Sequence, residues 1–169
     1  MKAKNYIRTI MIFLFIMSLI FAKKSSAQIQ SMAGPRIGVT IIVPGETADV
    51  LNQNDGKSAF TTQYGWQWES RFVSGTEFVG LVEWVVVAGG MEKGKFLPSV
   101  SSIIGFRNAE GFEMGMGPNL SFGGLGMVFG MGMNFKSGEL NMPINIVIVP
   151  PKENSGIAVS VIIGFNMSK

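Results

Sequence analysis

Residues 125–135, LGMVFGMGMNF, carry a large apolar side chain at every odd position and Gly, Val or Asn at every even position. A period of two residues is typical of a β-strand, because successive side chains point to opposite faces of a sheet. One face of this strand is therefore bulky and apolar, and the other is small and largely polar.

Comparable segments, each followed by turn residues, recur along the rest of the chain. No stretch of helical periodicity competes with them after residue 30. They have the length of about 9–11 residues that a tilted strand needs to cross a lipid bilayer. We predict eight strands, at 35–44, 59–73, 77–88, 96–107, 111–122, 125–135, 140–149 and 157–166.

The connections between these strands alternate in length. Those at 45–58, 89–95 and 150–156 are longer than the intervening ones, with the two-residue link 123–124 as the exception. Membrane β-barrels show this asymmetry, with short periplasmic turns and longer external loops. The three long connections are therefore the candidate contact surfaces outside the cell.

Aromatic side chains in the bulky column gather near the short connections. A ring of aromatic residues at one level is typical of the membrane–water interface of a barrel, although a Phe-rich layer could also close an ordinary core. We predict a periplasmic-side aromatic girdle made of Phe72, Phe78, Phe106, Phe112, Phe135 and Phe165.

In strand number, alternation and girdle, residues 35–169 resemble the small eight-stranded outer-membrane β-barrel proteins of Gram-negative bacteria. The resemblance implies an all-β fold, an eight-stranded antiparallel up-and-down transmembrane β-barrel, in the bacterial outer membrane. Its implied partners are membrane lipid and, during insertion, the barrel-assembly machinery. The last strand, IAVSVIIGFN, is similar to the insertion signal of that family, although the chain continues through 167–169.

Three prolines, Pro98, Pro118 and Pro143, fall inside predicted strands. Proline has no N–H to donate to a β-ladder. We therefore expect a bulge, a strand end or a shorter strand at each of them.

The small, polar column also carries charged residues, most of them near the short connections. Eight-stranded barrels have interiors that side chains just fill, and buried charges persist only when paired. The charges could thus form a paired plug in the lumen; alternatively, several could ring the wet periplasmic rim. The predicted lumen ionic cluster is Arg36, Glu69, Arg71, Glu77, Glu83, Arg107 and Glu113.

The first 27 residues have a cationic start, an apolar stretch at 9–22 and small residues before Gln28. This layout predicts a secretory signal peptide, 1–27, cleaved between Ala27 and Gln28. The apolar stretch is short for a membrane anchor, which needs roughly 20 residues. A short segment, 28–34, would then precede the barrel.

Cleavage changes the charge of the chain. Five of the fourteen Lys and Arg residues lie in the first 27 positions, which leaves nine against eleven Asp and Glu, or −2 instead of +3. The basic character belongs to the export signal, so no nucleic-acid partner is expected.

The sequence contains neither histidine nor cysteine. Both the usual general base near neutral pH and the usual soft metal ligands are missing. A two-carboxylate site, such as Glu83 with Glu69 or Glu113, is the remaining catalytic arrangement, but carboxylates in an internal network are more often structural. We expect no enzymatic activity, no cofactor and no metal.

These features predict a non-enzymatic outer-membrane barrel with a structural or interaction role, a narrow polar lumen, short external loops and an unidentified external partner. The alternative is a soluble periplasmic carrier similar to the lipocalins, in which the faces are reversed and Trp66, Trp68 and methionines line a cavity. A third possibility is a low-conductance channel.

Overall fold

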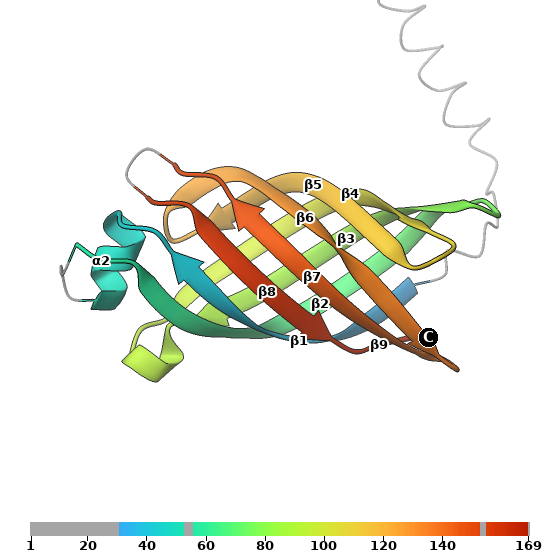
Figure 1. Cartoon of the computed structure of the whole chain (residues 1–169), viewed down its shortest axis with the longest axis horizontal. Coiled ribbons are helices and arrows are strands. Elements are labelled where there is room, and N and C mark those ends of the chain that lie inside the picture. The colour runs from blue at the N-terminus through green and yellow to red at the C-terminus, as the bar shows by residue number, and fades with distance from the viewer. Residues whose placement is uncertain (1–30, 53–55, 153–154, 169) are drawn as a thin grey trace, which may run out of the picture.

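The strands follow one another around a closed cylinder (Figure 1). The computed structural model describes residues 31–52, 56–152 and 155–168. Its strands are β1 (Ser31–Ile42), β2 (Ala59–Ser74), β3 (Phe78–Gly89), β4 (Leu97–Asn108), β5 (Phe112–Ser121), β6 (Gly124–Ser137), β7 (Leu140–Val149), β8 (Ala158–Gly164) and β9 (Asn166–Ser168).

Each strand pairs antiparallel with the next, and β1 closes the cylinder by pairing with both β2 and β8. The short β9 continues β8 after a break at Phe165 and pairs with β1 and β7. The two together form the eighth strand. The predicted eight-stranded up-and-down barrel is confirmed.

Prolines explain the break in the eighth strand. Pro35 on β1 and Pro143 on β7 lie beside it, on either side of Phe165. Because neither has an N–H, the ladder cannot be completed there. Pro118 has a similar effect on β5. The β4–β5 pairing is interrupted opposite it and resumes in the same register. Pro98 stands near the start of β4, where a strand tolerates it.

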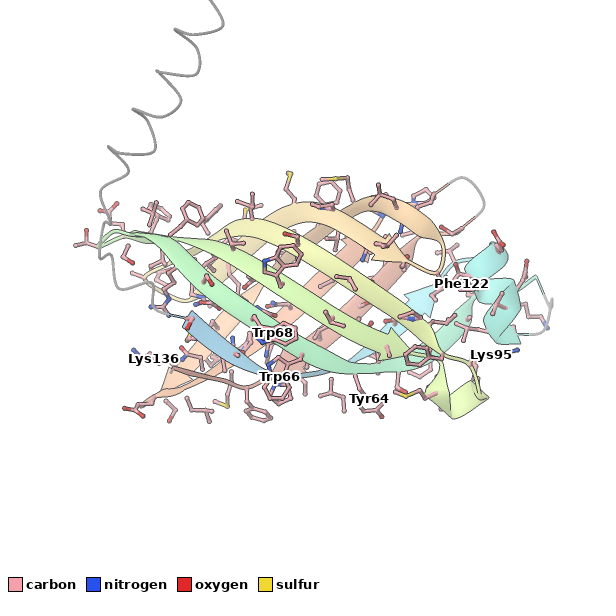
Figure 2. The ribbon with its side chains drawn as sticks, turned by 180° about the vertical axis from the view of Figure 1, so that it is seen from behind. Tyr64, Trp66, Trp68, Lys95, Phe122 and Lys136 are labelled. Atoms are coloured by element: carbon pink, nitrogen blue, oxygen red, sulfur yellow. The ribbon has the colours of Figure 1, made fainter. Side chains whose placement is uncertain are left out.

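The two faces of the wall have opposite chemistry. Large apolar side chains point outward and are exposed, whereas Arg, Glu, Gln, Asn, Ser and Thr line the inside and are buried. Trp66 and Trp68 lie on the outer face of β2, 43% and 47% exposed (Figure 2). The reversed arrangement, with both tryptophans lining an internal cavity, is therefore wrong.

The ends of the barrel differ. At one end, which we call the turn end, residues 75–77, 109–111 and 138–139 connect the strands. The other, the loop end, carries α2 (Glu46–Asn52) and the 3-10 turn η1 (Met91–Lys93) (Figure 1). Among the described residues, neither helix is long or apolar enough to span a membrane.

The helix α2 was not predicted, because the sequence showed only a long connection there. Its Ala48 and Leu51 are buried against Ile42 and Ala59, where the first two strands reach the loop end. This apolar cluster fixes the helix over one side of the barrel mouth.

The barrel begins earlier than expected. Strand β1 starts at Ser31 and pairs with β2 from its first residue, so the prediction that 28–34 precedes the barrel is wrong for residues 31–34. The signal peptide and the Ala27–Gln28 cleavage site lie outside the described residues.

Candidate functional site: the polar lumen

Arg107 is the centre of an ionic network inside the turn-end half of the barrel. Its Nη1 and Nη2 donate to Glu69 Oε1 and Oε2 at 2.9 and 2.7 Å, a bidentate pair. Its Nε donates to Glu113 Oε2 at 2.8 Å. The three residues come from β4, β2 and β5 and are all buried, so one guanidinium holds two carboxylates away from water.

A second chain of contacts runs beside the first. Arg36 Nε on β1 donates to Gln67 Oε1 at 2.8 Å, and Gln67 Nε2 donates to Glu83 Oε1 at 2.8 Å. A neutral amide thus stands between the arginine and the carboxylate. Gln67 occupies an inward position of β2 and is 3% exposed, yet the sequence analysis did not count it in the cluster because it carries no charge.

The structure brings together five members of the predicted lumen cluster: Arg36, Glu69, Glu83, Arg107 and Glu113. Arg71 stands at the edge, with Nε 3.5 Å from Glu69 Oε1 and its side chain 21% exposed.

Glu77 is not part of the cluster, contrary to the prediction. It is exposed in the turn 75–77, because β2 ends at Ser74 and β3 begins only at Phe78. Side chains alternate between the two faces only within a strand, so the sequence position of Glu77 does not place its side chain in the lumen. The rim interpretation holds for this residue.

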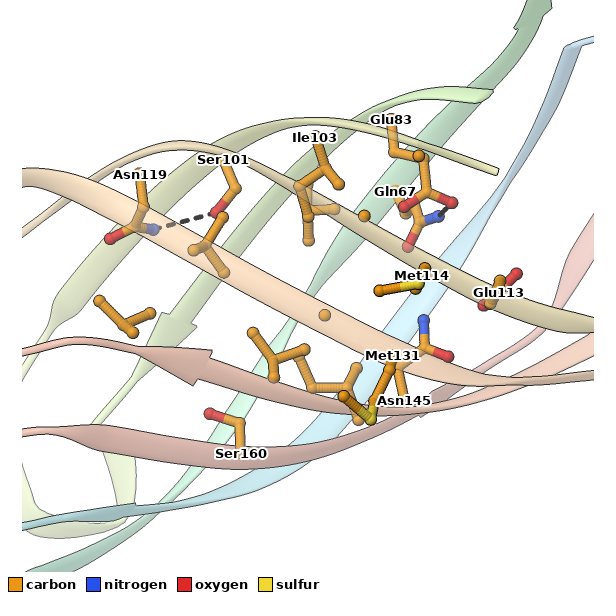
Figure 3. Close-up of a pocket in the computed structure, with 18 of the residues that line it drawn as sticks. Gln67, Glu83, Ser101, Ile103, Glu113, Met114, Asn119, Met131, Asn145 and Ser160 are labelled. Atoms are coloured by element: carbon orange, nitrogen blue, oxygen red, sulfur yellow. Dashed lines mark hydrogen bonds between the residues drawn. The ribbon is translucent and has the colours of Figure 1, made fainter. Parts of the chain in front are cut away.

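The network is polarised along the barrel. Glu83 and Glu113 line a cavity of about 90 Å³ on the loop side, together with Gln67 and apolar side chains (Figure 3). Arg71 and Arg107 line a recess on the opposite side, at the turn end. Two carboxylates of the network therefore line one compartment of the lumen, and two of its guanidinium groups line the other.

Hydroxyl and amide groups line the loop-side half of the lumen, including much of the cavity wall. Asn119 Nδ2 lies 2.7 Å from Ser99 Oγ and 2.9 Å from Ser101 Oγ, the latter contact drawn in Figure 3. The hydroxyls of Thr40 and Ser160 are 2.8 Å apart. These groups are neutral, and they lie between the ionic network and the loop-end mouth.

Lys152 lies across the loop-end mouth. It comes from the connection between β7 and β8, and its Nζ donates to Asn119 Oδ1 at 3.1 Å, to Ser121 Oγ at 2.9 Å and to the carbonyl of Gly124. Desolvation lowers the pKa of its ammonium group. A loop residue has no periodic pattern, so alternation of faces could not place it in the mouth.

The six phenylalanines of the predicted girdle all lie at the turn end, on the outer face of the barrel. Five are clearly exposed and Phe112 is half-buried. Phe78 and Phe106 meet edge to face, with ring centroids 5.9 Å apart. Phe72 is the extra residue of a β-bulge in β2, and its ring lies over Gly80.

Within the described ranges, no three acidic side chains converge into a metal site. Both carboxylate oxygens of Glu69 accept hydrogen bonds from Arg107, and Glu83 accepts one from Gln67. The arrangement can hold charge, water or a small guest inside the lumen.

No protein-family model matches the sequence. No curated protein sequence matches it either. Solved structures do resemble the chain in fold. Ail, the attachment invasion locus protein of Yersinia pestis, in its complex with the heparin analogue sucrose octasulfate, aligns with 83% of this chain and 99% of its own, at 9% identity and a TM-score of 0.51.

Two further structures align with lower scores. The outer membrane enzyme PagL matches over 78% of this chain and 98% of its own, at 13% identity and a TM-score of 0.49. A de novo designed transmembrane β-barrel matches over 83% and 95%, at 10% identity and a TM-score of 0.48. At these identities the likeness concerns the fold alone: the chain has the fold of the small eight-stranded outer-membrane β-barrels.

Proposed function

We propose that this protein is a non-enzymatic β-barrel of the bacterial outer membrane, exported through a cleaved signal peptide, with a structural or interaction role. The observation that carries the proposal is the inversion of the wall. Apolar side chains cover the outside of a closed barrel, and a paired ionic network fills part of the inside.

A bilayer accounts for both halves of that observation. Hydrocarbon tolerates apolar side chains but no unpaired backbone groups, and a closed barrel leaves no free strand edge. In water, the same outer surface would be a contiguous apolar patch far larger than monomeric soluble proteins expose. The exposed phenylalanines at the turn end fit one interface of the bilayer.

The internal chemistry supports a role without catalysis. The sequence has no histidine, and both oxygens of Glu69 are bound by Arg107. In this proposal the network stabilises the barrel, while the loop end, with α2 and η1, is the surface that meets an external partner. That partner is not identified by any motif in the loops.

The test is fractionation of cells that express the full chain, followed by electrophoresis of boiled and unboiled samples. The proposal expects recovery in the outer membrane, a heat-dependent mobility shift and an N-terminus at Gln28 by mass spectrometry. Recovery in the soluble periplasmic fraction would refute the location.

The non-enzymatic role is tested separately on the same membranes. We expect unchanged lipid composition by mass spectrometry, relative to cells that carry the empty vector. A new lipid product that disappears in a Glu83→Gln or Glu113→Gln variant would refute it.

A further inference from the structure

The loop-side half of the lumen contains two adjoining cavities, which we together call the chamber. The cavity above the ionic network and a second one of about 110 Å³ at the mouth share wall residues, so the mouth adjoins the cavity that the carboxylates line. The shared residues are Gln63, Ser99, Asn119, Val149 and Ser160.

Glu83 forms part of the chamber wall, and no described Lys or Arg forms an ion pair with it. It is 9% exposed, and its one hydrogen bond among the described residues comes from the neutral amide of Gln67. A buried carboxyl group without a counter-charge favours its neutral form, and a cation from the chamber would stabilise the ionised form in its place.

Glu113 adds an independent reason. It is 5% exposed, and Arg107 binds only its Oε2. Its Oε1 is buried and has no hydrogen-bond partner in the described part of the chain. Glu113 lines the same cavity as Glu83, whereas Arg107 lines the recess on the other side.

The rest of the cavity wall defines what kind of cation would fit. It is largely apolar, and apart from Glu83 and Glu113 its polar side chains are uncharged amides and hydroxyls. An inorganic cation would gain little from the apolar part, whereas a short alkyl group would be buried there. The apolar wall is made of Leu81, Val85, Val87, Ile103, Val128, Val147 and Ile162.

We propose that this chamber binds a small primary ammonium compound with a short alkyl body, its ammonium group at Glu83 and Glu113 and its alkyl group against the apolar wall. Lys152 restricts access to the chamber. Its side chain crosses the mouth over Gly126, where a Cβ would collide with it, and its own ammonium is held by neutral oxygens.

The test is a titration of the folded full chain in detergent micelles with n-propylammonium, followed by methyl NMR. We expect saturable shifts of the Ile103 and Val128 methyl signals. In Glu83→Gln and in Glu113→Gln we expect the affinity to fall by a factor of about ten or more. The matched control is Glu92→Gln in η1, on the loop surface, which should bind like the native protein. Lys152→Met should bind several-fold more tightly, because the mouth opens and a like charge is removed.

Competing ligands make the result decisive. A response to n-propanol equal to that of n-propylammonium would mean an apolar pocket, and an equal response to sodium would mean an inorganic cation site; either would overturn the proposal. So would the absence of saturable shifts, or full binding in both Gln variants. If the Gln variants do not show the folded, heat-modifiable form, Lys152→Met decides: tighter binding supports the proposal and unchanged binding overturns it.

Discussion

Arg107→Met is the sharpest test of the ionic network. The substitution keeps the apolar stem but removes the three hydrogen bonds of 2.7–2.9 Å that the guanidinium makes with Glu69 and Glu113. It leaves Glu113 without its cation, and Glu69 with only the longer contact of 3.5 Å to Arg71. Breaking a buried pair in this way costs about 3–5 kcal/mol, so we expect the free energy of unfolding to fall by about 4 kcal/mol.

The same reasoning predicts a rescue. Replacing both carboxylates by amides, in a triple variant Arg107→Met, Glu69→Gln and Glu113→Gln, removes the uncompensated charges while it keeps their volume. Since the penalty arises mainly from the unpaired charges, the triple variant should regain most of the loss and lie within about 1–2 kcal/mol of the native barrel.

The assay is reversible urea unfolding in lipid vesicles, followed by tryptophan fluorescence and by the heat-dependent gel shift. Glu77→Gln, at the exposed turn position, is the control and should change stability by less than about 0.5 kcal/mol. A loss below about 1 kcal/mol for Arg107→Met, or a triple variant no more stable than the single one, would show that the network does not bear on stability.

Three further predictions concern other parts of the barrel. Brominated lipids should quench the tryptophan emission strongly, because Trp66, Trp68 and Trp84 are all exposed on the outer face; efficient quenching by aqueous iodide instead would contradict the orientation of the wall. Gly34→Ala should destabilise the barrel by about 1–3 kcal/mol, because its methyl group would overlap a backbone carbonyl at the break of the last strand, whereas Gly130→Ala has room and serves as the control in the same unfolding assay. Desolvation raises the pKa of Glu92, but hydrogen bonds from threonines of β2, including Thr62, together outweigh it and lower the pKa to about 2. The contact between Glu92 and Thr62 is therefore present above the unfolded-state pKa and is lost as the pH falls through about 2. The amide chemical shift of Thr62 should titrate with that midpoint in the native protein and should not titrate in Glu92→Gln. A midpoint near 4.5 would contradict the bonding.

Much of the barrel could be anticipated from the order of residues alone. Alternation is a local property of a strand, so it indicated eight strands and separated their two faces before any pairing was known. Strand boundaries agree within a few residues, and 140–149 coincides with β7. The greatest differences are at β1, which begins at Ser31, and at the interrupted last strand.

The sequence predicted most of the charged residues that line the lumen, but not which of them bond to one another. The period of two assigned Arg107 and Glu69 to the interior, but their sequence positions are far apart and only the closed barrel brings them within 2.7 Å. The alternating pattern also assigned Glu77 to the interior, because a sequence pattern does not reveal where a strand ends. It undervalued Gln67, since a neutral amide gains its importance from the two charged groups on either side of it.

The sequence thus decides the chemistry of each face of the wall, because that chemistry depends only on the parity of each position along a strand. The tertiary structure decides which interior groups are paired and which are not. Curvature brings Glu69 of β2 to Arg107 of β4, which also bonds Glu113 on the adjacent β5, while Glu83 bonds the amide of Gln67. Closure also places Lys152 of a polar loop over the mouth, since the contacts that hold it come from β5 and the start of β6.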